Sequence, residues 1–196
     1  MTRIFRGNGE SIPVSVLEVG PCYITQIKKT EKDGYNAIQV GFRPKKDKRI
    51  NKPLLGHFKI AGKGGFAYLR EIKVEDVDSF ELGQEVTSEI FTAGDLVTVR
   101  GLSKGRGFSG VVKRWGFSGG KKTHGCRSHK VPGSIGASAS PSRVVKGKKL
   151  PGRAGNQRIT VKNLAIFDVV NEKNLILVKG AVPGSKGGLL EVKMTR

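Results

Sequence analysis

The chain has 196 residues, of which 36 are basic and 16 acidic, so its net charge is +20 at neutral pH, and 37% of its residues are hydrophobic. This length holds one sizeable domain, or one domain with an elaborate insertion. No apolar run approaches the 18 residues of a transmembrane helix, the amino terminus lacks the apolar core of a signal peptide, and two distant cysteines make no disulfide framework. We therefore expect no membrane association and a reducing, intracellular setting.

The first third of the chain has the pattern of β structure. Residues 11–19 alternate apolar and polar side chains, and residues 22–28 follow as a second strand after a Gly-Pro dipeptide. A turn at 31–34 leads into a third strand at 37–42. These spacings predict antiparallel pairing into a small barrel or sandwich.

The middle of the chain is more polar. A charged loop at 44–49 is followed by a short predicted helix at 54–60. Residues 71–95 contain eight of the sixteen acidic side chains and are typical of a separate, solvent-facing subregion. A strand is predicted at 96–100.

The last part of the chain returns to β structure. Residues 159–170 and 175–182 alternate well and are joined by the four residues 171–174, which is a good hairpin signal. A strand at 189–194 is expected to complete the sheet. We therefore predict a β body formed by residues 1–100 and 159–196, with an inserted subregion at 44–95 and a long basic, glycine-rich loop at 101–158, here called the finger.

Positive charge is concentrated in one internal segment. Between Asp95 and Asp168 lie 72 residues without a single Asp or Glu, and 16 of them are Lys or Arg. Such a segment cannot neutralise itself and needs a polyanion, for which nucleic acid is the default candidate. A solvated basic tail is the alternative, but tails lie at chain ends and this segment is internal.

The finger contains partial matches to two phosphate-binding motifs, and neither match is complete. Residues 105–110 spell GxGxxG, but a dinucleotide site requires a following helix and an acid about twenty residues later. Here residues 111–115 have the pattern of a strand, and no acid occurs before Asp168. Gly120-Lys121 is followed by a lysine where a phosphate-binding loop requires Ser or Thr.

Aromatic residues are interleaved with the basic ones. The sequence Gly-Phe-Ser-Gly occurs at 107–110 and again at 116–119, with Trp115 between the two copies. Beside lysines and arginines, such rings suit stacking on bases or sugars. Alternatively, Phe108, Trp115 and Phe117 form a local apolar cluster under the loop. Both interpretations stay open from the sequence.

The residues His124, Cys126 and His129 are close together in the sequence. Structural zinc usually takes a second pair of ligands, which this segment lacks, so no metal site is predicted. Contacts to RNA are the better interpretation for both histidines. The finger contains no carboxylate to act as an acid, a base or a metal ligand, so neither a catalytic residue nor a cofactor is predicted.

The predicted tip of the finger is small and uncharged. Residues 132–141 lie between basic stretches, and Ile135 with two prolines favours a shaped turn over a flexible linker. A thin, neutral tip suits threading into folded RNA. The tip residues are Gly133, Ser134, Ile135, Gly136, Ala137, Ser138 and Ala139.

The predicted RNA-binding residues are basic, histidine or tryptophan side chains of the finger. They are Lys104, Arg106, Lys113, Arg114, Trp115, Lys121, Lys122, His124, Arg127, His129, Lys130, Arg143, Lys146, Lys148, Lys149, Arg153 and Arg158.

Several long motifs resemble one family. The runs KRWGFSGGKKTHGCRSHKVPGSIG (113–136), SRVVKGKKLPGRAGNQRITVKNL (142–164) and NLILVKGAVPG (174–184), with the opening MTRIF…IPVSVLEVGPCYITQIK, are similar to the bacterial-type large-subunit ribosomal protein L-three. The resemblance covers nearly the whole chain.

The resemblance implies a fold and a function. It implies a mainly β fold, namely a six-stranded Greek-key β-barrel of the translation-protein type with an inserted small α+β subregion and a long basic loop extension. The implied function is that of a structural constituent of the cytoplasmic ribosome, which binds large-subunit rRNA near its 3′ end, helps nucleate assembly, and extends its finger towards the peptidyl transferase centre. The implied partners are this rRNA and the neighbouring proteins L-fourteen and L-nineteen, with no small-molecule substrate.

The chain departs from the family pattern in two places. Members usually begin with a short strand ending in Gly-Met-Thr, and this chain starts at the Met-Thr of that motif. Two interpretations stay open, namely a barrel weakened by the missing strand and a start that lies elsewhere in the full product. Some members carry a methylated glutamine after the GSIG run, where this chain has Ala137, Ser138 and Ala139. The alternatives to the ribosomal interpretation are an RNA-modifying or RNA-processing enzyme, for which no motif is found, and a sequence-nonspecific nucleic-acid chaperone.

Overall fold

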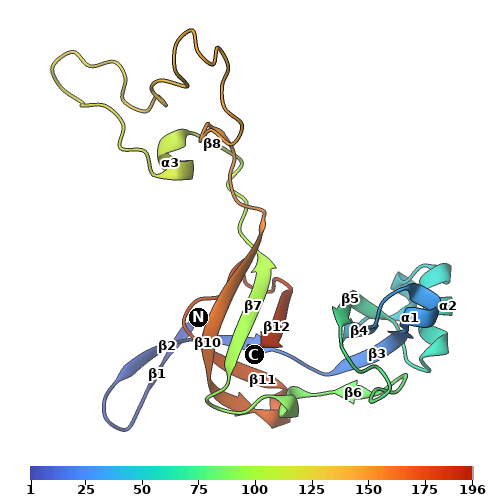
Figure 1. Ribbon diagram of the computed structural model, residues 1–196. Coiled ribbons are helices and arrows are strands. Elements are labelled where there is room, and N and C mark those ends of the chain that lie inside the picture. Colours follow the sequence, from blue (N-terminus) through green and yellow to red (C-terminus); the bar gives the residue numbers. More distant parts are fainter. Residues whose placement is uncertain (196) are drawn as a thin grey trace. The chain divides into compact units, whose positions relative to one another are not determined.

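The computed structural model describes residues 1–195 (Figure 1). The chain divides into two compact units. Unit 1 comprises Met1–Thr98, Lys162–Ala181 and Lys193–Arg196, and unit 2 comprises Val99–Val161 and Val182–Val192. Within residues 1–195, no helix has the length and apolarity needed to cross a membrane.

The largest sheet has six strands in the order β1-β2-β11-β10-β7-β12. Their bounds are β1 Thr2–Phe5, β2 Ser11–Glu18, β7 Leu96–Leu102, β10 Arg158–Val170, β11 Leu175–Lys179 and β12 Leu190–Met194. Within it, β12 lies beside β7, so the last of the four strands β7, β10, β11 and β12 along the chain neighbours the first. The sheet is open, because β1 and β12 are its two edges, so the closed barrel implied by the resemblance is not seen.

Burial changes face partway along β2. Successive side chains of a strand point to opposite faces, so the buried Ile12 and Val14 lie on one face and the buried Ser15 and Leu17 lie on the other, while Val16 is exposed. On β11, Ile176 and Val178 are fully buried. The predicted strands at 11–19 and 175–182 therefore exist but end earlier, and β11 stops at Lys179 because Gly180 has a φ of +100°.

A hairpin with a capped turn joins β10 to β11. The turn is the 3-10 helix η3 (Asn171–Lys173), and Asn174 ends it in the left-handed conformation with a φ of +50°. The side chain of Asn174 also accepts a hydrogen bond from the backbone N–H of Ser88 at 3.2 Å, and the Ser88 hydroxyl donates to the Asn171 side chain at 2.9 Å. These bonds connect the hairpin to the 3-10 helix η2 (Ser88–Ile90).

A second sheet in unit 1 has four strands in the order β5-β4-β3-β6. Their bounds are β3 Cys22–Lys28, β4 Ala37–Pro44, β5 Phe66–Lys73 and β6 Glu85–Val86, and the accompanying helices are α1 Thr30–Asp33, η1 Asp47–Arg49 and α2 Lys52–Ile60. The core contains Ile24, Ile38 and Val77, and Phe58 of α2 packs edge-on against Phe66 with ring centroids 5.6 Å apart.

The segments of β2, β3 and β4 were expected to pair antiparallel in a small barrel or sandwich, but β3 and β4 lie in a different sheet from β2. β3 pairs with β4 and β6, and β2 pairs with β1 and β11. Gly20-Pro21 separates β2 from β3, so the two strands are not joined by a hairpin turn. The predicted turn at 31–34 is a single helical turn, α1, ended by Gly34 with a φ of +80°.

Unit 2 contains three short elements besides its parts of β7, β10 and β12. They are β8 (Phe108–Ser109), α3 (Val111–Trp115) and β9 (Gly152–Arg153). The strand predicted at 111–115 is wrong, because this segment is the helix α3. Gly110 stands at its N-cap, and Gly116 ends it with a φ of +76° while its N–H donates to the Val112 carbonyl. The Val-Val pair favours a strand, but burial of Val111 and the two glycines enforce one helical turn.

Candidate nucleic-acid interface

Unit 2 is almost free of negative charge. Its 16 basic residues face a single carboxylate, that of Glu191, which lies 3.8 Å from the Arg100 guanidinium. None of the basic side chains predicted to bind RNA forms an ion pair within residues 1–195. Their charges are therefore left for an external anion, and like charges this dense repel each other without one.

A two-stranded ribbon forms the base of the finger. β8 pairs with β9 antiparallel, and the Arg106 N–H donates to the Ala154 carbonyl while the Ala154 N–H donates to the Gly107 carbonyl, both at 2.9 Å. The two segments of the ribbon approach closely at Gly155, where an added Cβ would lie 2.0 Å from the Lys104 carbonyl oxygen. Gly155 also has a φ of +71°. Only glycine fits there without displacing the backbone.

Helix α3 is fastened to the returning chain at Leu150. The Leu150 carbonyl accepts one hydrogen bond from Arg114 Nη1 at 2.7 Å and another from Trp115 Nε1 at 2.9 Å. The Arg114 guanidinium lies 4.9 Å from the centroid of the Trp115 ring, and Lys149 Nζ lies 5.9 Å from it. We call this arrangement the Leu150 latch; it brings residues 35 and 36 positions apart together and closes the loop between them.

The chain between α3 and β9 contains neither helix nor strand (Figure 1). It folds back on itself near its start, where the Gly120 N–H donates to the His129 carbonyl at 3.2 Å. An added Cβ at Gly119 would lie 2.4 Å from the His129 carbonyl oxygen, and one at Gly120 would lie 2.5 Å from that of Ser128. The Gly-Gly pair therefore permits two loop segments to touch through their backbones.

The structure leaves the predicted site residues at the surface of unit 2. Every one of the seventeen predicted RNA-binding residues is exposed except Arg114, which is half-buried in the Leu150 latch. The tip residues 133–139 are all exposed, and the Ser134 hydroxyl donates to the Gly136 carbonyl at 2.9 Å. Of the predicted set, the structure brings Arg114, Trp115 and Lys149 together.

The segment with His124, Cys126 and His129 shows no metal-like arrangement. Within residues 1–195, no group of three or more His, Cys, Asp or Glu side chains is placed to hold a metal ion. His124 has a φ of +57° and both histidines are exposed.

The rings of the finger do not form the apolar cluster that was one of the two alternatives. Phe108 is 80% exposed and Trp115 is 43% exposed. No ring contact joins Phe108, Trp115 and Phe117 among the residues that the structure describes. Phe108 was not among the predicted site residues. The signal that points to it is its place in the first Gly-Phe-Ser-Gly copy beside Arg106.

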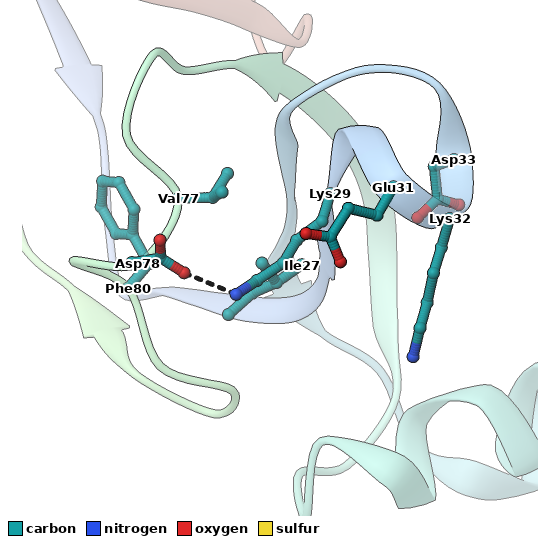
Figure 2. Close-up of a pocket in the computed structure, with 8 residues that line it drawn as sticks. All are labelled: Ile27, Lys29, Glu31, Lys32, Asp33, Val77, Asp78 and Phe80. Atoms are coloured by element: carbon teal, nitrogen blue, oxygen red, sulfur yellow. Dashed lines mark hydrogen bonds and ion pairs between the residues drawn. The ribbon is translucent and has the colours of Figure 1, made fainter.

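A depression in unit 1 lies apart from the basic segment in sequence (Figure 2). Ile27, Val77 and Phe80 contribute apolar surface, and Lys29 points to Asp78, with which it forms an ion pair that raises the pKa of the lysine. The helical turn α1 adds the charged residues Glu31, Lys32 and Asp33. Basic and acidic side chains both line the depression and largely offset each other, so it lacks the strongly positive character of unit 2.

The nearby surface of the same sheet is also neutralised internally. Lys28 Nζ lies 2.8 Å from Glu71 Oε1 and 2.8 Å from the Tyr35 hydroxyl, which donates to Glu71 Oε2 at 2.8 Å. The hydrogen bond from Lys28, and then that from Tyr35, lowers the pKa of Glu71. Lys28 and Lys29 of unit 1 thus have carboxylate partners, whereas in unit 2 the one carboxylate, Glu191, lies beside Arg100.

The exposed, carboxylate-poor basic unit has the electrostatic character that suits a polyanion. Comparison with known proteins defines the family. The sequence model of the family described as Ribosomal protein L3 matches residues 60–174.

Similar proteins cover nearly the whole chain. The large ribosomal subunit protein uL3 of Desulfosudis oleivorans is 62% identical over 193 residues, which is 98% of this chain and 93% of that protein. The proteins of the same name from Syntrophotalea carbinolica and Thermotoga petrophila are 52% and 50% identical, each over 100% of this chain and over 94% and 93% of their own length. The chain therefore belongs to the ribosomal protein L3 family, as its motifs indicated.

Membership in this family gives the chain a structural role in the large ribosomal subunit, and hence in a ribonucleoprotein that carries out translation in the bacterial cytoplasm.

Proposed function

We propose that this chain binds large-subunit rRNA directly, near the 3′ end of the molecule, and helps to nucleate assembly of the subunit. In this proposal the finger at 101–158 runs inward towards the peptidyl transferase centre, with residues 133–139 at its tip. The neighbouring proteins are L-fourteen and L-nineteen. The observation that carries the proposal is the charge of unit 2, in which 16 basic residues accompany one carboxylate.

Phosphate neutralisation is the main source of affinity in this proposal. Each neutralised phosphate releases a counterion. For every such phosphate, the logarithm of the binding constant therefore falls by roughly 0.7 to 0.9 per unit of log salt concentration. If about eight of the basic side chains contact phosphate, the slope is roughly −6 to −7. Folded RNA is recognised largely by shape and backbone, which suits a finger with many exposed cations and a narrow, neutral tip.

The finer features of the fold belong to the same proposal. We propose that the six strands of the larger sheet curl into the Greek-key barrel, and that the insertion expected at 44–95 begins earlier, after β2, because β3 and β4 lie in the second sheet. The β12-β7-β10-β11 order supports the topology. A barrel would also remove the exposed edges that β1 and β12 now present.

The test compares two RNAs and two proteins. Binding is measured across a salt series to a folded fragment with the 3′ region of large-subunit rRNA and to an unrelated structured RNA of equal length. The same titrations use a variant in which residues 102–157 are replaced by a short Gly-Ser linker, with its fold checked by circular dichroism. We expect a strong preference for the rRNA fragment and a steep salt slope that becomes shallower in the variant.

Two outcomes would overturn parts of the proposal. Equal affinity for both RNAs would indicate a nonspecific chaperone of nucleic acid and remove the assembly role. An unchanged affinity and slope after replacement of the finger would move the contact surface to unit 1.

A further inference from the structure

The structure separates Trp115 from Phe108, which the sequence leaves as candidates for stacking on bases. The indole N–H of Trp115 is bonded to the Leu150 carbonyl, and two cations of the chain already lie over its ring. Phe108 makes no ring contact and has no cation over its ring within residues 1–195. It is also 80% exposed, more than any other large hydrophobic residue within residues 1–195.

The β8–β9 ribbon gives Phe108 a fixed position. Phe108 is directly opposite Arg153, and Ser109 is opposite Gly152. Residues directly opposite in an antiparallel pair have their side chains on the same face. Phe108 and Arg153 therefore share one face of the ribbon.

The other face of the ribbon is used by the protein itself. Ser109 is buried, and an added Cβ at Gly152 would lie 2.6 Å from Arg114 Nη1, so the guanidinium of α3 occupies the space beside Gly152. The face with Phe108 and Arg153 is thus the outward one. A ring held on a paired strand loses little conformational freedom when a ligand stacks on it.

The charges around the Phe108 ring indicate which kind of ligand it suits. A base stacks on an aromatic face whatever its sequence, and a cation beside the ring is suited to the phosphate of the same or the next nucleotide. Unit 2 has one carboxylate, Glu191, which is occupied by Arg100. An anionic partner with flat rings, which is to say RNA, complements this face better than an apolar protein surface does.

We propose that Phe108 is a stacking platform for one unpaired base of rRNA and that Arg153 neutralises a phosphate beside that base. This inference rests on the proposed function, because it names one contact within the RNA-binding surface. It assigns Phe108 to recognition in the bound state and Trp115 to the internal structure of the finger.

The test separates ring stacking from charge. The full chain carrying Phe108→Ala, Phe108→Leu, Phe108→Tyr or Arg153→Gln is titrated with the folded rRNA fragment across a salt series. Phe108→Ala and Phe108→Leu should raise Kd roughly 5- to 100-fold, as expected for loss of one stacked base, with the salt slope unchanged. Phe108→Tyr should bind like the unaltered chain. Arg153→Gln should instead make the slope shallower by roughly 0.7 to 0.9.

Phe5→Ala is the matched control, because Phe5 is a phenylalanine of unit 1 that is 68% exposed. It should leave both Kd and slope unchanged. Thermal unfolding of every variant checks that the fold is retained, which is expected because the Phe108 side chain is largely in solvent. Ultraviolet cross-linking should join the peptide that contains Phe108 to one nucleotide.

Two results would overturn the inference. If Phe108→Leu binds as tightly as the unaltered chain, the residue is an apolar filler and not a stacking platform. If Phe108→Ala also leaves Kd unchanged, the ring faces a protein neighbour or solvent. In both cases the unaltered chain would still prefer the rRNA fragment, whereas loss of that preference would mean that the proposed function itself fails.

Discussion

The Leu150 latch predicts that Trp115 stabilises the free protein. The substitution Trp115→Phe keeps an aromatic ring but removes the indole N–H that donates to the Leu150 carbonyl at 2.9 Å. A hydrogen bond of this kind contributes about 1 kcal/mol net. A guanidinium 4.9 Å from the ring centroid contributes about 0.5–1 kcal/mol at a partly exposed site, and a phenyl ring retains part of that. The expected cost is therefore about 1–2 kcal/mol of local stability.

Amide hydrogen exchange is the appropriate assay, because the loss is expected in one subregion and not in the whole chain. The amides of Arg106 and Ala154 report on the ribbon, since each donates a hydrogen bond across it. A cost of 1–2 kcal/mol corresponds to exchange roughly 5 to 30 times faster at these amides. The amide of Ile24, in unit 1, is the internal reference and should not change.

Phe108→Ala is the control for this experiment, because Phe108 is exposed and its ring has no partner in the described residues. A surface substitution of this kind stays within about 0.5 kcal/mol. Unchanged exchange at Arg106 and Ala154 in Trp115→Phe would refute the latch. Equal acceleration in Phe108→Ala would show that any loss of an aromatic ring loosens the ribbon.

Three further predictions concern charge, backbone space and thiol reactivity. Replacing four finger lysines with glutamine should make the salt slope of rRNA binding shallower by up to roughly 3, whereas four replacements in unit 1 should not; the two sets are Lys121, Lys122, Lys148 and Lys149, and Lys32, Lys45, Lys46 and Lys48. Gly155→Ala places a Cβ 2.0 Å from a backbone oxygen at a φ of +71° and should cost about 2 kcal/mol or more in denaturant unfolding. Gly105→Ala, whose Cβ would lie 3.5 Å from its nearest neighbour, should cost far less, and equal losses would contradict the steric argument. Burial raises the pKa of the Cys22 thiol to about 11, so in a Cys126→Ser variant the rate of iodoacetamide alkylation should climb with pH towards 11, and a plateau near pH 8.5 would contradict it.

Local pattern was a good guide where strands are half-buried. The strand at 22–28 was predicted with its observed bounds, and those at 11–19 and 37–42 were predicted to within two residues. The short helix at 54–60 exists and begins two residues earlier, at Lys52. These segments owe their structure to side-chain alternation or to helix propensity, which are properties of neighbouring residues.

The elements that were missed are short and depend on distant partners. β6, β8 and β9 have two residues each, which is too few for a period to be visible. Each exists because another segment supplies its hydrogen bonds, as β9 does for β8 across 42 intervening residues. The helix α3 was predicted as a strand because its Val-Val pair favours a strand, whereas burial of Val111, the flanking glycines and the Leu150 latch favour the helical turn.

By itself, the sequence determined the family, the mainly β class and the segregation of charge into one internal segment. Composition and sequence motifs do not depend on how the chain folds. A segment of 72 residues without an acidic side chain needs an external counter-charge in any fold. Tertiary structure alone decided that β3 and β4 belong to a separate sheet, that the Trp115 indole N–H donates to the Leu150 carbonyl, and that the Phe108 ring is exposed to solvent. Pairing partners and exposure depend on contacts between residues that are far apart in sequence, and no local pattern encodes which of two aromatic rings will be covered.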